Sequence, residues 1–130
     1  MKKRLLSLVF ILMTLVSQAQ LSHSPVNEVL NAIRINRVQE VSRYMDNFIS
    51  ITLNNSQSLY SKNQAEIIIK DFFDKNPASD FSMADEGSAD KNSKFAIANF
   101  NASGEKFSLY ILFKQKDNTF LVQEIRINRE

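Results

Sequence analysis

The spacing of apolar residues changes near Pro77 in this 130-residue chain, and that change limits the folds available to it. Before Pro77, apolar residues recur mainly every three or four positions, as they do on one face of a helix. After Pro77 they alternate with polar residues, as in strands that bury one side. The pattern predicts an α+β domain in which helices come first and an antiparallel sheet follows.

Two short helices are expected at the start of the domain. Ser24 is a suitable N-cap, and Pro25 follows it at the first helical position. Asn36 is expected to cap the second helix, with Gln39 at the capping-box spacing. The predicted apolar faces consist of Val26, Val29, Leu30 and Ile33 in the first helix, and of Val38, Val41, Tyr44 and Met45 in the second.

A third, longer helix carries the clearest boundary signals. Ser61 and Gln64 have the capping-box spacing at its start. It should end near Lys75, because Pro77 lacks a backbone N–H and disfavours helical geometry at Asn76. Its predicted apolar face consists of Ala65, Ile68, Ile69, Phe72 and Phe73.

The remaining segments predict strands and turns. One strand, residues 48–53, is expected between the second and third helices, and the Asn54-Asn55-Ser56 segment should end it. Gly104 suits a hairpin turn, because glycine readily adopts positive φ. The strands expected after Pro77 are a short one at 81–84, broken by the polar stretch 85–93, and longer ones at 95–101, 105–115 and 119–128.

The two faces of the predicted sheet differ in their expected roles. Phe72 and Phe73 of the long helix should form the core against one face, which carries Phe107, Leu109, Ile111 and Phe113. The other face is less polar than a solvated sheet requires, and it therefore predicts a homodimer that forms through that face. Its apolar residues are expected to be Ala96, Ala98, Tyr110, Leu112 and Val122.

The N-terminus has the pattern of an export signal. Lys2, Lys3 and Arg4 precede the uncharged apolar residues 5–16, and small residues lead up to Ala19. The apolar run is shorter than the roughly 20 residues that span a membrane. We therefore expect a signal peptide at 1–19, and a soluble periplasmic or extracellular domain at 20–130 with no membrane anchor.

Composition narrows the possible functions of the exported domain. Without the predicted signal peptide, acidic residues slightly outnumber basic ones, which argues against nucleic acid or anionic lipid as a partner. The chain has no cysteine, so thiol chemistry, disulfides and lipoprotein attachment are excluded. It also has no phosphate-binding loop or zinc-ligand spacing, and neither cofactor nor metal is expected.

Several segments resemble a bacterial secreted family known as domain of unknown function 4783, over about residues 26–128. The resemblance implies a nuclear transport factor 2-like fold, in which a strongly curved antiparallel sheet wraps around the long helix to form a cone. Members of this family often carry a His-Gln-Gly triplet after the second strand, where this chain has Asp85-Glu86-Gly87. The segments that carry the resemblance are Tyr60 to Glu66, Asp71-Phe72-Phe73, Asn76-Pro77 and Phe120 to Ile127.

Enzymes with this fold place a carboxylate or histidine deep in the cone, so we consider which residues here could line a pocket. Asp85 and Glu86 are adjacent carboxylates, which equally suit a solvated turn beside Gly87. Glu124 and Arg126 project from the same face of the last strand and are expected to form an ion pair. The pocket candidates are Tyr44, Asp85, Glu86, Tyr110, Glu124 and Arg126.

Three functions remain open. The first is an exported, non-catalytic module that binds a small apolar ligand or another protein. The second is a small-molecule lyase or isomerase in which Asp85, Glu86 or Glu124 acts as the base. The third is a structural domain that acts only through its sheet surface, with the cone plugged by Phe side chains. An enzyme requires a buried ionisable group in a pocket, whereas a binding module does not.

Overall fold

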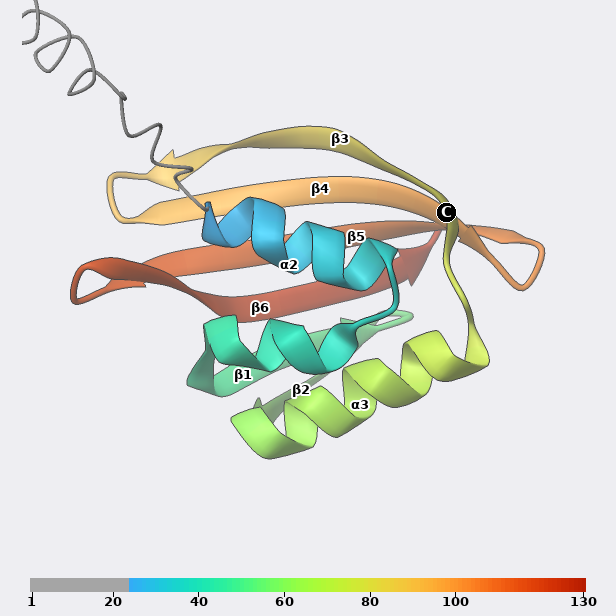
Figure 1. Ribbon diagram of the computed structural model, residues 1–130, viewed down its shortest axis with the longest axis horizontal. Coiled ribbons are helices and arrows are strands. Elements are labelled where there is room, and N and C mark those ends of the chain that lie inside the picture. The colour runs from blue at the N-terminus through green and yellow to red at the C-terminus, as the bar shows by residue number, and fades with distance from the viewer. Residues whose placement is uncertain (1–23) are drawn as a thin grey trace, which may run out of the picture.

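The computed structural model describes residues 24–130 and shows helices packed on one side of a six-stranded sheet (Figure 1). This arrangement confirms the expected α+β class. The predicted signal peptide, residues 1–19, lies outside the described residues. The elements are α2 (Pro25–Arg34), the 3-10 helix η1 (Val38–Tyr44), β1 (Met45–Leu53), β2 (Ser56–Ser61), α3 (Lys62–Lys75), β3 (Ser79–Asp90), β4 (Ser93–Ala102), β5 (Glu105–Lys116) and β6 (Thr119–Arg129).

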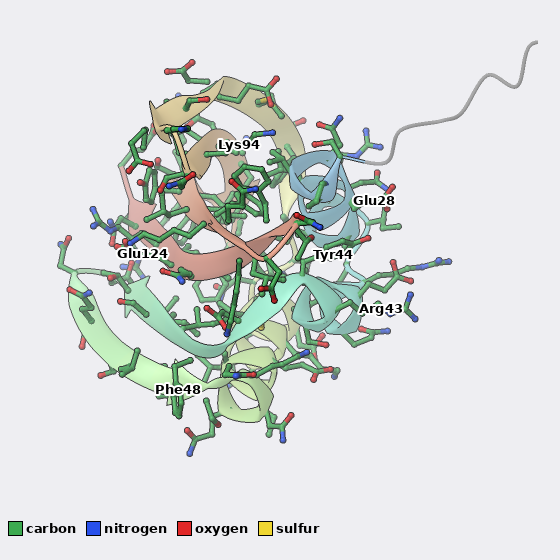
Figure 2. The ribbon with its side chains drawn as sticks, turned by 90° about the vertical axis from the view of Figure 1, so that its left-hand side faces the viewer. Glu28, Arg43, Tyr44, Phe48, Lys94 and Glu124 are labelled. Carbon is green, nitrogen blue, oxygen red and sulfur yellow. The ribbon has the colours of Figure 1, made fainter. Side chains whose placement is uncertain are left out.

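The strands form one open sheet in the order β2-β1-β6-β5-β4-β3, so β2 and β3 are its two edges. Four of the neighbouring pairs are antiparallel, but β1 and β6 run parallel. The expectation of a fully antiparallel sheet is therefore wrong at this one pair. The last strand extends the meander formed by β3, β4 and β5, and its other edge pairs with β1. Figure 2 shows the sheet bending as it passes from β3 to β2.

The boundaries of α3 are as the sequence predicts. The Ser61 hydroxyl accepts a hydrogen bond from the Gln64 backbone N–H at 3.4 Å, and the Gln64 side chain accepts one from the Ser61 N–H at 3.3 Å. At the other end, the Asn76 side chain donates to the Phe72 carbonyl at 3.0 Å. Polar groups at both ends of the helix are thus satisfied before the chain reaches Pro77.

The predicted start of α2 is confirmed, whereas that of η1 is wrong. Ser24 occupies the N-cap position of α2, but its side chain makes no capping hydrogen bond. Asn36 does not cap η1. It adopts a φ of 58° in the reversal between the helices, and Arg37 takes the N-cap position without a side-chain cap. The expected capping box with Gln39 is therefore wrong, because the chain uses Asn36, a residue tolerant of the left-handed region, to turn.

The sequence pattern misses the edge strand β2 and shortens the edge strand β3. Residues 56–61 form β2, which pairs with β1 through a tight turn at Asn54 and Asn55, both with positive φ. The polar stretch at 85–93 does not break β3, which runs unbroken from Ser79 to Asp90. Nearly every residue of these two strands is exposed or half-buried, so neither strand needs the alternation of apolar residues that identifies a strand in sequence.

Aromatic rings fill the space between α3 and the sheet. Phe73 and Phe107 are buried, and the half-buried Phe72 contacts both, with ring centroids 5.1 and 5.8 Å away. Phe100 stacks on Phe107 at 5.3 Å and on Phe81 at 6.2 Å. The predicted packing of Phe72 and Phe73 against the sheet is confirmed. These five side chains, here called the aromatic cluster, join α3 to β3, β4 and β5.

The predicted assignment of residues to the other sheet face is partly wrong. Ala96 and Ala98 lie opposite Ile111 and Leu109 and are fully buried on the helix side. Val122 lies opposite Phe113 and is also fully buried. Alternation does not decide the faces of β4, because each row carries apolar side chains at its centre: Phe95 and Ile97 in one, Ala96 and Ala98 in the other. Of the five residues predicted for the side away from the helices, here called the outer face, only two lie there: Tyr110 and Leu112.

Phe100→Ala is expected to lower the free energy of unfolding by about 3–5 kcal/mol, because it removes the centre of the aromatic cluster and leaves a cavity. Urea denaturation measures the change. As a control, Phe48→Ala removes a ring that is 64% exposed and should change the free energy by less than about 0.5 kcal/mol. Equal losses in the two variants would contradict the assigned core.

Ser61→Ala is expected to lower the free energy of unfolding by about 1 kcal/mol, because the Gln64 N–H loses its acceptor. Ser24→Ala is the matched control at the start of α2, where the serine side chain makes no cap, and it should have little effect. Thermal or urea unfolding of the two variants tests the difference. A larger loss for Ser24→Ala would contradict the described capping.

Candidate functional site

The outer face carries an open hollow of about 520 Å³ where β1, β2, β5 and β6 meet, here called the outer hollow. Its volume is within the range of small-molecule sites. Its walls combine charged, amide and apolar side chains. The residues that matter below are Asp46, Phe48, Leu59, Lys114, Lys116, Gln123 and Glu124.

Two irregularities in strand pairing create the outer hollow. Between β1 and β6, the segment from Met45 to Ser50 lies opposite the shorter segment from Val122 to Glu124. Between β5 and β6, Leu112 lies opposite Glu124 and Phe113 opposite Val122, which leaves Gln123 as an extra residue. Such bulges bend a strand and redirect its side chains. Both bulges fall at the same place in the sheet.

Asp46 anchors the floor of the outer hollow. Its carboxylate accepts hydrogen bonds from Lys116 Nζ at 3.0 Å, Gln123 Nε2 at 3.0 Å and the backbone N–H of Asn47 at 2.7 Å. The hydrogen bond from Lys116 is the largest cause that holds the pKa of Asp46 below its ordinary value, followed by the Asn47 N–H. The Asp46 side chain is only 14% exposed, so this anion links β1 to β5 and β6.

The rim of the outer hollow exposes apolar side chains. Phe48 of β1 is 64% exposed and Leu59 of β2 is 70% exposed. Beside them, the exposed Lys114 forms no ion pair within residues 24–130. The outer hollow thus offers apolar contact next to a free ammonium group.

The structure brings together three of the six pocket candidates, on the outer face. Glu124 and Arg126 form the expected ion pair, and Glu124 lines the outer hollow. The Arg126 guanidinium lies 5.2 Å from the centre of the Tyr110 ring. Figure 2 shows Glu124 on the side of the molecule away from α2 and η1. These groups are therefore not inside the helix-covered side of the sheet, where a catalytic pocket of the cone was considered.

The other three candidates lie elsewhere. Tyr44 ends η1 and packs, half-buried, against the core, on the helix side in Figure 2. Asp85 and Glu86 lie exposed on the edge strand β3, opposite Ile97 and Ala96, and so point to opposite faces. Glu86 lines a separate depression of about 400 Å³ near the start of α2. The six candidates do not form one site.

Sequence reasoning missed the residues that build the outer hollow. Asp46 and Lys116 are 70 positions apart, and no local pattern connects them. The sequence pattern places Phe48 at the start of a strand, but it does not show that the ring is 64% exposed. Alternation assumes regular pairing, so a bulge that redirects Gln123 leaves no periodic signal.

Residues 24–130 contain no cluster of three or more His, Cys, Asp or Glu side chains arranged to hold a metal ion. Within the same residues, no helix has the length and apolar character needed to cross a membrane.

Solved structures place the fold. A DUF4783 family protein from Bacteroides ovatus ATCC 8483 is 25% identical, with a TM-score of 0.75 over 79% of this chain and 93% of that chain. One from Bacteroides fragilis YCH46 is 26% identical, with a TM-score of 0.73 over 79% and 96%. An NTF2-like protein of unknown function from Cytophaga hutchinsonii ATCC 33406 is 8% identical, with a TM-score of 0.60 over 82% and 87%. The fold is NTF2-like, as the resemblance implied.

The comparison with curated proteins gave no match. The family model described as Domain of unknown function (DUF4783) matches residues 26–128, in agreement with the segments that carry the resemblance. The chain therefore belongs to the DUF4783 family.

Proposed function

We propose that this protein is an exported, non-catalytic binding module that recognises its ligand or protein partner at the outer hollow. Export is inferred from the basic residues, apolar run and small residues within positions 1–19. The binding role is inferred from the distribution of apolar side chains between the two sides of the sheet.

The observation that carries this proposal is the contrast between the two sides. On the helix side, the aromatic cluster occupies the space where a cone-shaped domain would hold a ligand. On the outer face, Phe48 and Leu59 are largely exposed beside an open hollow. Exposed apolar side chains that are grouped around polar ones are typical of a surface used for binding.

The surroundings of the carboxylates favour binding over the lyase or isomerase alternative. A general base works best with a pKa near the operating pH, which for a carboxylate requires burial or a like charge. The pKa of Asp46 is instead lowered, and its carboxylate already accepts three hydrogen bonds. Glu124 is ion-paired with Arg126, and the Asp85 and Glu86 residues lie exposed at a sheet edge.

The composition of the outer hollow indicates what kind of ligand fits it. The rings and branched chains of Phe48 and Leu59 favour an apolar group. Lys114, which has no ion-pair partner among the described residues, favours a hydrogen-bond acceptor or an anion next to that group. A wholly apolar ligand would leave this ammonium group unused.

Phe48→Ser is expected to reduce at least about tenfold the amount of any molecule that copurifies with the protein from its natural cells, because it removes the main apolar contact of the outer hollow. Mass spectrometry of the copurifying small molecules and proteins gives the measurement. Ile67→Ser is the matched control, because Ile67 is 67% exposed but lies on α3. Equal retention by both variants, or nothing bound to the wild-type protein, would contradict the proposal.

The floor of the outer hollow should depend on pH through Asp46. Because its pKa is lower in the folded protein than in the unfolded chain, its ionised form stabilises the fold above about pH 4. That stabilisation is lost as the pH falls through the lowered pKa. Asp46→Asn should therefore be less stable than wild type at pH 7, and the difference should shrink in acid.

Urea denaturation from pH 7 down to pH 3 measures this difference. Asp117→Asn is the control, because Asp117 is exposed in the turn between β5 and β6 and asparagine tolerates its φ of 57°. Its difference from wild type should be small throughout. A difference for Asp46→Asn that does not change with pH would show that the carboxylate does not stabilise the floor.

A further inference from the structure

The two edges of the sheet are unlike each other. β3 carries four acidic residues and its pairing with β4 has three register shifts, both of which hinder another strand from adding to it. β2 has no charged residue and no proline, and it pairs with β1 without any register shift. Figure 2 shows β2 at the margin of the sheet. Only β2 is therefore a regular, uncharged edge.

The turn between β1 and β2 determines which backbone groups of β2 face outward. Leu53 lies opposite Ser56 across a two-residue turn, and such a closing pair exchanges backbone hydrogen bonds. By alternation, Ser58 also bonds to β1, whereas Gln57 and Leu59 direct their N–H and C=O groups away from the sheet. Further along, the outward N–H of Ser61 is taken by the Gln64 side chain. The unpaired backbone groups are thus concentrated at Gln57 and Leu59.

We propose that β2 is a dimerisation edge, where a second copy of this chain adds its own β2 in antiparallel orientation. With the two-fold axis at Ser58, Gln57 lies opposite Leu59 of the second copy, and the two pairs exchange four backbone hydrogen bonds. The six-stranded sheets then join into one continuous sheet. This proposal does not depend on the function proposed for the outer hollow.

Charge and symmetry favour a second copy as the occupant. Two β2 strands meet without any charge repulsion, whereas two β3 strands would bring eight carboxylates together, four from each copy. If β2 paired with β3 of another copy, each pair of molecules would still have a free β2 edge and a free β3 edge. Further copies could then add, and the assembly would not stop at a dimer. In the symmetric arrangement, Leu59 lies diagonally across from its counterpart, and Phe48 lies diagonally beside it on the same face. The two Leu59 side chains then contact each other along the joined edge, and their outer face stays open.

Light scattering of the protein purified from its natural cells tests the proposal. The wild-type protein is expected to reach twice the monomer mass at high micromolar concentration. Leu59→Lys places a charge on the edge, and Gln57→Pro removes an N–H that faces away from β1, so each should raise the dissociation constant at least about tenfold. Ile67→Lys is the matched control on α3 and should leave the dimer unchanged.

A further variant distinguishes the edge from the sheet face. Leu112→Lys introduces a charge on the outer face, where the sequence predicted a dimer, and should leave the edge dimer intact. Thermal unfolding confirms that each variant is folded. The proposal is wrong if the wild-type protein is monomeric at high micromolar concentration. It is also wrong if the dimer survives both β2 substitutions, or if mass keeps rising beyond the dimer with concentration.

Discussion

The other elements of this structure depend on the packing of α3 against the sheet through aromatic rings. Phe73 contacts the rings of Phe72 and Phe100, and Phe100 in turn stacks on Phe107. Each such buried ring contributes on the order of 1.5–3 kcal/mol. The same rings occupy the space between the C-terminal part of α3 and the sheet. The exposed apolar side chains Phe48 and Leu59 lie instead on the outer face.

The outer hollow is a product of strand irregularity. A regular sheet would place side chains from β1 and β6 in even rows, with no depression between them. Here two bulges coincide, and Asp46 bridges the distorted strands through Lys116 and Gln123. Because one carboxylate satisfies donors from three positions, the distortion is held by specific contacts. The arrangement suits a site whose shape exists before anything binds.

The sequence predicted elements best where two independent signals agreed. For α3, the capping box at Ser61 and the proline at Pro77 delimit the same amphipathic segment, and both ends are confirmed. The edge strands were missed or truncated because exposed strands need no apolar alternation. The faces of β4 could not be separated, since alanines face the helices and larger side chains face outward. For the site, the ion pair between Glu124 and Arg126 was expected from their spacing on one strand, but the bulges and the contact between Asp46 and Lys116 depend on tertiary structure alone.

The parallel pairing of β1 with β6 affects the order in which the chain can fold. β1 has only β2 as a neighbour until β6 has been made, and the backbone N–H of Asn54 then donates to the Ile127 carbonyl at 2.9 Å. Contacts between such distant parts of a chain form slowly, because a long loop must close first. During synthesis, the sheet therefore lacks the strand between β1 and β5 until β6 emerges. Until then, β1 and β5 each keep one edge without a neighbouring strand.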